Sequence, residues 1–352
     1  MTLDRGPVGV IYVALCLSWT TAGNASDKTP SAGKGESGAV TTPNSKMPSE
    51  YVYKTAEGQS LKIVAHFPDD WKKGDKRPAI VFFGGGGFNP NVEEGGPTET
   101  AGDPGSAFLP AAEYFAKRGL VTLRAGYRKR KAFGIMPDKA IEDAISAMRW
   151  VRKNAGMLGI DPDRIVSAGG SSGGNLAGSV ACIEEFQSPD DDRSVSPKPN
   201  AMLLHYPLLD WLGEGSASEG FMKALGGDRE YGARISPARH WSADMPPTLI
   251  LIGTKDPMYE TLTQFVATWK QRGAPIDIFV GEGGGHGFSA NSPWLEKATL
   301  RSDEFLQSIG YLKETPHVDL PSRVKTEAQK AEKAARKAAQ GAPGAAPVEK
   351  QP

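Results

Sequence analysis

The chain has 352 residues, which is enough for one large α/β domain or two ordinary ones. Hydrophobic residues make up 39% and charged residues 23% of the sequence, and 41 Lys and Arg balance 41 Asp and Glu, so the net charge is +0. This balance gives no indication of nucleic acid binding, which needs a basic surface. The two cysteines are too few for a framework of several disulfides.

The N-terminal residues 1–25 have the pattern of a secretory signal peptide. Arg5 precedes an apolar run from Val8 to Leu17, and small residues follow it. The run is shorter than the ~20 residues that a membrane span needs, so we expect cleavage and a secreted or periplasmic protein without stable membrane insertion. An uncleaved anchor is the alternative. Cleavage would leave Cys182 alone, and it is expected to be buried in packing.

Low-complexity segments flank the remaining chain. Residues 26–49 are rich in Ser, Gly, Lys, Thr and Pro, which predicts a disordered linker. Residues 321–352 form a basic, Ala- and Lys-rich tail that is expected to be disordered or a frayed helix, and to be solvated rather than bound to a polyanion. The folded domain is therefore expected to span residues 50–320.

Within that domain, apolar runs of strand length alternate with segments of helical periodicity. The first two strands flank a turn at residues 57–59 and suggest a hairpin at a sheet edge, whereas most later strands are unbroken apolar runs, as expected for strands that are covered on both faces. The irregular segment 211–246 is expected to be a small cap insertion. The order predicts a doubly wound, mostly parallel eight-stranded sheet. Its strands are expected at 51–53, 61–67, 78–83, 120–124, 165–168, 201–206, 247–253 and 276–280, and its helices at 107–118, 138–155, 259–272, 295–309 and directly after residue 171.

The tract from Ile165 to Ala177 indicates a strand, a sharp turn and a helix. Its centre has the pattern Gly-x-Ser-x-Gly, in which a serine at the turn needs a strained backbone to expose its hydroxyl at the top of a sheet. A Cβ atom two residues before or after that serine would collide with its surroundings, and glycine removes the clash. The following helix aims N–H groups back at the site, where an oxyanion would develop.

Two registers fit this motif, with either Ser171 or Ser172 at its centre. We favour Ser171 as the nucleophile, because Ser172 then supplies a backbone N–H and two glycines remain where the helix packs on the strand. The alternative without function is a surface loop of glycine and serine, which a lone match to this motif does not exclude.

An acid and a base are expected at the same edge of the sheet, after later strands. Asp256 and His286 occupy such positions, and the order serine, acid, histidine is that of α/β-hydrolases rather than of trypsin-like or subtilisin-like enzymes. Asp210, after the preceding strand, is the alternative acid. The remaining four histidines are assigned to structural positions or, for His240, to the cap.

These residues give the chain, from about residue 51 to 312, a resemblance to the α/β-hydrolase superfamily. Within it the chain is similar to the hormone-sensitive-lipase-like and the feruloyl and acetyl-xylan esterase-like carboxylesterases. The shared signs are a glycine motif after an early strand and, in this order, the tracts 164–177, 253–257 and 286–288.

The resemblance implies a role for each site residue. Ser171 would be the nucleophile, His286 the general base and then acid, and Asp256 the group that orients the imidazole. The N–H groups of Ser172 and of Gly85 or Gly86 would form the oxyanion hole. No metal or organic cofactor is implied.

One departure from the family lies in the oxyanion loop. The family has His-Gly-Gly-Gly there, and in this sequence Phe83 or Gly84 stands in the place of the histidine. The backbone donors remain, but the side chain that helps to order the loop in the family is missing.

We therefore predict a serine carboxylesterase that works through an acyl-enzyme on a small-molecule or glycan ester, with acetyl or feruloyl esters of glycans as the substrate class that the resemblance suggests. Three alternatives use the same fold. They are a lipase-like hydrolase, a peptidase-like hydrolase and a catalytically silent binding protein.

Overall fold

A computed structural model describes residues 48–86, 88, 104, 106–129, 136–213, 222–223, 225–313 and 318–322. All of them fall within one compact unit, Val40–Pro352. The predicted signal peptide (1–25), nearly all of the linker (26–49) and the tail beyond residue 322 lie outside the described residues. Those three assignments, and the secreted or periplasmic location that depends on the first, stay predictions.

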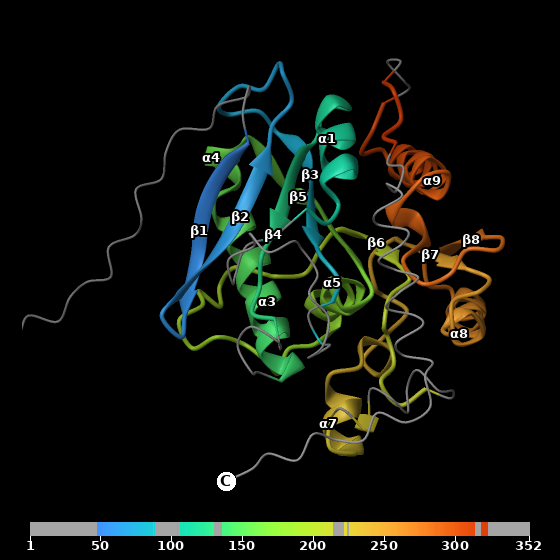
Figure 1. Cartoon of the computed structure of the whole chain (residues 1–352). Helices are drawn as coiled ribbons and strands as arrows, with labels where there is room; N and C mark the ends of the chain where they lie inside the picture. The colour runs from blue at the N-terminus through green and yellow to red at the C-terminus, as the bar shows by residue number, and fades with distance from the viewer. Residues whose placement is uncertain are drawn as a thin grey trace, which may run out of the picture. The chain divides into compact units, whose positions relative to one another are not determined.

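The domain is built on one eight-stranded sheet with the strand order β1-β2-β4-β3-β5-β6-β7-β8 (Figure 1). Strand β2 pairs antiparallel with both β1 and β4, and every other neighbouring pair is parallel. The predicted mostly parallel, eight-stranded sheet is confirmed. The strands are β1 Ser49–Ala56, β2 Gln59–His66, β3 Arg77–Phe83, β4 Val121–Ala125, β5 Ile160–Gly170, β6 Ala201–His205, β7 Thr248–Gly253 and β8 Ile276–Gly281.

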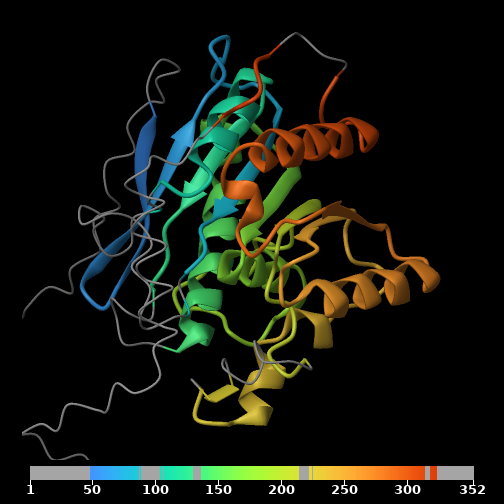
Figure 2. The ribbon, with the colours of Figure 1, turned by 45° about the vertical axis from the view of Figure 1, so that its right-hand side comes forward.

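Helices cover the sheet and follow the strands along the chain. Helices α3 and α5 pack against each other, and α1 and α9 lie side by side (Figure 2). The buried Arg118, directly after α1, forms an ion pair of 2.6 Å with Asp303 of α9. The α-helices are α1 Leu109–Lys117, α3 Pro137–Lys153, α4 Ala155–Leu158, α5 Ser172–Cys182, α7 Arg229–Arg234, α8 Tyr259–Gln271 and α9 Trp294–Ser308, and the 3-10 helices are η1 Pro237–Arg239 and η2 Phe288–Ala290.

The burial of each strand follows its apolar pattern and its place in the sheet. Every residue of β4, β6 and β7 is buried, as their unbroken apolar runs predict. Strand β8 is an edge strand, and its Val280 is 37% exposed. Strands β5, β6, β7 and β8 are parallel, so their carboxyl ends lie side by side. The candidate site residues follow these strand ends.

The predicted cap region contains more regular structure than its sequence suggests. Helix α7 begins after Asp228, whose side chain accepts a hydrogen bond of 2.9 Å from the N–H of Tyr231, as an N-cap aspartate does. The helix lies apart from the sheet layers (Figures 1 and 2). We missed it because a helix of six residues has too few turns to produce a periodic pattern.

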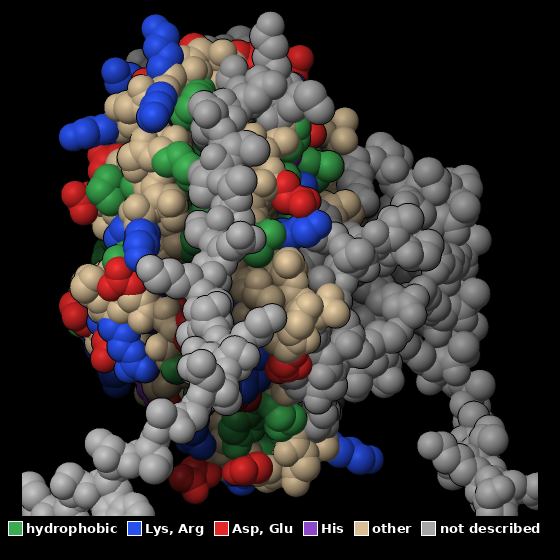
Figure 3. Space-filling view, turned by 90° about the vertical axis from the view of Figure 1, so that its left-hand side faces the viewer, with side chains coloured by type: hydrophobic (Ala, Val, Ile, Leu, Met, Phe, Trp, Pro, Cys, Tyr) green, Lys and Arg blue, Asp and Glu red, His purple; other side chains and the backbone are tan. Residues whose placement is uncertain are grey.

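One face of the described structure matches the balanced charge of the sequence. On the face at the β1 edge of the sheet, Lys and Arg side chains are interspersed with Asp and Glu (Figure 3). Among the helices that the structure describes, none combines the length and the apolar character that crossing a bilayer requires.

Candidate active site

Ser171 stands alone between the end of β5 and the start of α5. Its backbone has φ 55° and ψ −119°, a conformation that residues with a Cβ atom rarely adopt. The Ser171 N–H donates to the His205 carbonyl (3.1 Å), and the Ser171 carbonyl accepts from the N–H groups of Asn175 (3.1 Å) and Leu208 (3.2 Å). Backbone hydrogen bonds on both sides therefore hold the strained turn that aims the hydroxyl out of the sheet.

The strained backbone of Ser171 decides between the two possible registers, and the glycines on both sides of it are crowded. A Cβ atom added to Gly169 would lie 2.2 Å from the Gly173 carbonyl oxygen, and one added to Gly173 would lie 2.1 Å from the Phe83 carbonyl oxygen. These two crowded positions stand two residues before and two residues after Ser171. The structure thus places Ser171 at the turn and Ser172, which is buried, at the first position of α5.

Three predicted residues from distant parts of the chain form one hydrogen-bonded relay. His286 Nε2 lies 2.9 Å from Ser171 Oγ, and His286 Nδ1 lies 2.8 Å from Asp256 Oδ2. The Asp256 side chain is fully buried, while the His286 side chain is 41% exposed. Because Nδ1–H donates to the carboxylate, Nε2 is left to accept the proton of the serine hydroxyl.

The loops after β7 and β8 bring the acid and the base together. A Cβ atom at Gly253 would lie 2.2 Å from the Gly284 carbonyl oxygen, so the two loops touch through their backbones. The Lys255 N–H donates to the same carbonyl at 2.8 Å. Since Asp256 lies in the first loop and His286 in the second, this contact helps to hold the two residues together.

Two residues at the end of β6 support the histidine loop. His205 Nδ1 lies 2.9 Å from the hydroxyl of Ser289, three residues after His286, and burial lowers the pKa of His205 to about 4. The ring of Tyr206, which has φ 36°, lies 5.1 Å from the His286 ring in an edge-on arrangement. Tyr206 was not among the predicted site residues, although it directly follows a buried strand at the same end of the sheet, which was a usable signal.

The residues that were alternatives for the acid and the base contact other groups. Both Asp210 carboxylate oxygens accept from Arg239, at 3.0 and 3.1 Å, so Asp210 is held by an arginine while Asp256 meets the imidazole. His66 lies 3.3 Å from the Arg124 side chain, and His240 Nε2 lies 3.1 Å from the Arg234 carbonyl. The fifth histidine, at position 317, lies outside the described residues.

The predicted oxyanion loop follows β3 and rests on the first turn of α5. A Cβ atom at Gly173 would lie 2.4 Å from the Gly84 carbonyl oxygen, so the backbone of the loop touches the helix turn that carries Ser172. Gly85 follows at once, and Gly86 has φ 77°, a conformation that favours glycine. The predicted donors thus come from two segments that are in direct contact.

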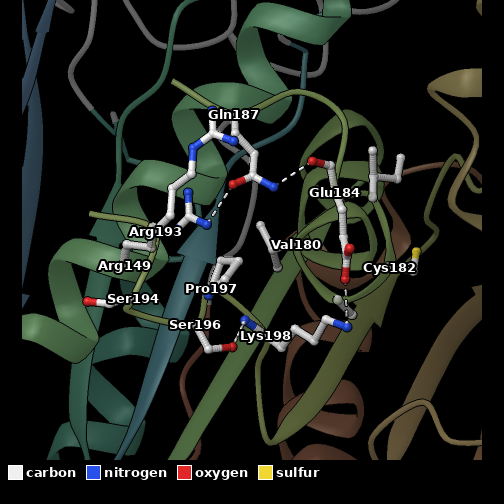
Figure 4. A pocket seen from close by; sticks show the side chains of 12 residues that line it. Arg149, Val180, Cys182, Glu184, Gln187, Arg193, Ser194, Ser196, Pro197 and Lys198 are labelled. Atoms are coloured by element: carbon white, nitrogen blue, oxygen red, sulfur yellow. Dashed lines mark hydrogen bonds and ion pairs between the residues drawn. The ribbon is translucent and has the colours of Figure 1, made fainter. Parts of the chain in front are cut away.

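A cavity of about 390 Å³ lies at the opposite end of α5 (Figure 4). Because α5 has 11 residues, this end is roughly 15 Å from Ser171. The guanidinium of Arg149 at this cavity bonds to the carbonyl of Val195, to Asp191 and to Gln187. Cys182 is partly buried at this cavity, and burial raises the pKa of its thiol to about 12, which disfavours the thiolate form.

Comparison with known proteins gives the family of the chain. Residues 136–290 match a family described as having the alpha/beta hydrolase fold. The solved apo structure of esterase 2 from Thermogutta terrifontis matches with 35% identity and a TM-score of 0.67, over 78% of this chain and 98% of that one. The chain belongs to the α/β-hydrolase family. The predicted fold and the resemblance to carboxylesterases of this family are confirmed.

Two curated relatives are similar over shorter parts of their length. An ethyl acetate hydrolase of Pseudomonas putida is 26% identical over 51% of this chain and 59% of its own length. An acetylxylan esterase of Xylanibacter ruminicola is 23% identical over 68% of this chain and 46% of its own length. This α/β-hydrolase therefore spans about half the length of these relatives.

Proposed function

We propose that the protein hydrolyses carboxylic esters through an acyl-enzyme on Ser171. The observation that carries this proposal is the relay from Ser171 through His286 to the buried Asp256, with hydrogen bonds of 2.9 and 2.8 Å. A serine hydroxyl is a weak nucleophile until a base removes its proton, and this arrangement provides the base and the group that fixes its tautomer.

The first half of the reaction forms the acyl-enzyme. Ser171 Oγ attacks the ester carbonyl carbon while its proton moves to His286 Nε2, and Asp256 stabilises the imidazolium. The tetrahedral intermediate collapses, the bond to the alkoxy oxygen breaks, and the leaving oxygen takes the proton from Nε2. In the second half, water gives its proton to Nε2 and attacks the acyl carbon. The proton returns to Ser171 as the acid leaves.

Backbone donors stabilise the negative oxygen of both intermediates. We assign the N–H of Ser172, at the start of α5, and the N–H of Gly85 or Gly86 to this role. Each such donor contributes about 3 kcal/mol to the stability of the transition state. The contact between Gly173 and the carbonyl of Gly84 supports this pairing, because it holds the two donor segments together.

We propose short acyl groups as the preferred acid part of the ester. The ring of Phe88, after the oxyanion loop, lies 5.3 Å from the ring of Trp211, after β6, and both side chains are buried. We propose that these two rings line the acyl side of the site, where they would favour a small apolar group. The Thermogutta terrifontis esterase has been solved with propionate and with butyrate bound, and the relatives above are named for acetyl esters. Acetyl esters of glycans are the natural substrates that we propose.

The experiment compares hydrolysis of p-nitrophenyl acetate by the wild type and by variants of the relay. Ser171→Ala is expected to remove the activity and to block covalent labelling by paraoxon, with which the Thermogutta terrifontis esterase has been solved phosphorylated. Asp256→Asn is expected to lower kcat by about 10⁴-fold, since the wrong imidazole tautomer then faces the serine.

Asp210→Asn is the matched control for the acid, because this carboxylate bonds to Arg239. It is expected to keep kcat within about twofold of the wild type. Hydrolysis that survives Ser171→Ala would refute the proposed nucleophile, and a loss of kcat in Asp210→Asn with activity kept in Asp256→Asn would reverse the assignment of the acid. A longer acyl chain preferred over acetate would favour the lipase-like alternative.

A further inference from the structure

The loop after β3 lacks the histidine of its family, yet its first glycine is held by a side chain from another strand. The hydroxyl of Tyr127 donates to the carbonyl of Gly84 at 2.7 Å, and Tyr127 is 1% exposed. Tyr127 follows β4, which pairs with β3 in the sheet. The contact therefore joins the ends of two neighbouring strands, 43 residues apart in the sequence.

Because of the geometry of the peptide group, this contact also fixes the direction of a backbone N–H donor. The carbonyl of Gly84 and the N–H of Gly85 belong to one planar trans peptide unit, in which they point in opposite directions. A hydrogen bond that fixes the carbonyl therefore also fixes the direction of the Gly85 N–H. The same carbonyl oxygen is in close contact with Gly173 of α5, so the peptide is confined from a second side.

The tyrosine itself is held on both sides along the chain. The carbonyl of Gly126 accepts a hydrogen bond of 2.7 Å from the Tyr53 hydroxyl, and the Gly126 N–H donates to the carbonyl of Lys62 at 2.8 Å. On the other side, Arg128 bonds to the fully buried Asp143 of α3 through its backbone N–H (3.0 Å) and its guanidinium (2.8 and 2.9 Å). These anchors hold the backbone on both sides of Tyr127, and its side chain is itself buried.

We propose that Tyr127 is a positioning residue for the oxyanion hole. It fixes the peptide between Gly84 and Gly85, so that the Gly85 N–H is aimed before the substrate arrives, and it supplies from a neighbouring strand the order that a loop histidine supplies in the family. A donor that is already in place loses no energy to reorganisation during the reaction. This role rests on the proposed function, and it assigns the second donor to Gly85 rather than to Gly86.

The test is removal of the single hydroxyl in Tyr127→Phe. Loss of a whole oxyanion donor lowers kcat by about 10²- to 10³-fold, and here the donor stays but is less well aimed, so kcat is expected to fall by about tenfold. KM for p-nitrophenyl acetate is expected to change by less than about twofold, because the interaction strengthens only in the transition state. Amide hydrogen exchange of the segment 84–86 is expected to become faster.

Tyr114→Phe is the matched control. Its hydroxyl is also in a buried hydrogen bond, of 2.9 Å, but it donates to Asp303 and joins α1 to α9. It is expected to lower the unfolding midpoint as much as Tyr127→Phe does while keeping kcat and the exchange of segment 84–86. A kcat for Tyr127→Phe within about twofold of this control would overturn the proposal.

Failure of the proposed function gives a different result. A wild-type protein without hydrolysis that depends on Ser171 would refute the esterase, and the exchange measurement would then decide alone whether Tyr127 orders the loop. Equal exchange of segment 84–86 in Tyr127→Phe and Tyr114→Phe would rule out that ordering.

Discussion

The two ends of helix α5 differ in what their polar groups are bonded to. At the amino end, Ser171 takes a strained backbone and its hydroxyl lies 2.9 Å from the imidazole of His286, whose side chain is 41% exposed. At the carboxyl end, a cavity of about 390 Å³ is present, but the guanidinium of Arg149 donates hydrogen bonds to three acceptors of the protein itself. Strain and a reactive pair, rather than the size of a cavity, therefore distinguish the site.

Among the variants that keep the three relay residues, the largest effect is expected from an extra methyl group at the amino end. In Gly173→Ala, the new Cβ atom would lie 2.1 Å from the Phe83 carbonyl oxygen, and backbone must shift to make room. A displacement of about 1 Å between catalytic elements costs roughly 100-fold in rate, so kcat/KM is expected to fall by at least that factor. Steady-state kinetics with p-nitrophenyl acetate would measure it.

Gly178→Ala is the control further along the same helix. Its Cβ atom would lie 3.3 Å from side-chain atoms of Leu209 and Pro237, which is tight but adjustable. The gain in helix propensity, about 1 kcal/mol, offsets this crowding, and activity is expected to be retained. Equal losses of activity in both variants would mean that the crowding at Gly173 has no special link to the site.

At the carboxyl end, the expected effect is on stability alone. Arg149→Met removes the partner of Asp191, whose side chain is 12% exposed, and is expected to lower the free energy of unfolding by about 3 kcal/mol. Denaturant unfolding would measure this change, and kcat should stay within about twofold of the wild type.

Lys153→Met on the same helix α3 is the control for Arg149. Its ion pair with Asp192 is exposed, with 60% and 42% of the two side chains accessible, and such pairs contribute about 0–1 kcal/mol. A fall in kcat for Arg149→Met without loss of stability would contradict the separation of the two ends and point to coupling along α5.

The same contrast explains what could be predicted from the sequence. The Gly-x-Ser-x-Gly turn depends on local steric contacts, so five consecutive residues are enough to predict the crowding around Ser171. Asp256 and His286 follow buried strands, and the topology of a parallel sheet brings such positions to one edge. The local sequence pattern and the order of the strands were together sufficient to predict that these three side chains lie close together.

The support around the site could not be predicted in the same way. The bond from Tyr127 to Gly84 depends on which strands are neighbours and on the direction of one side chain, and a tyrosine after a strand is compatible with many contacts. The ion pair between Arg118 and Asp303 joins residues 185 positions apart, and no periodicity marks either partner. Strand β5 also begins at Ile160, five residues before its apolar run, because polar residues at its start lie at the margin of the sheet.

The most gradual effect is expected from pH, through histidines that are buried in the neutral form. Burial lowers the pKa of His205 to about 4, and burial together with the nearby Arg124 lowers that of His66 to about 4, whereas an unfolded histidine has a pKa of about 6.5. The unfolded chain therefore binds protons that the folded chain does not. The stabilisation is fully present above about pH 6.5, and stability is expected to fall as the pH drops from there to about 4.

Urea unfolding at pH 7 and pH 4.5 separates the two histidines. His205→Gln should weaken the contact with Ser289 at both pH values, yet it should reduce the loss of stability between them, since one of the two buried histidines no longer titrates. His66→Gln should reduce the pH dependence equally but leave the loop of His286 intact, so kcat at pH 7 should fall only in His205→Gln. An unchanged pH dependence in both variants would mean that other groups govern acid unfolding, and that the contact of His205 with Ser289 survives protonation.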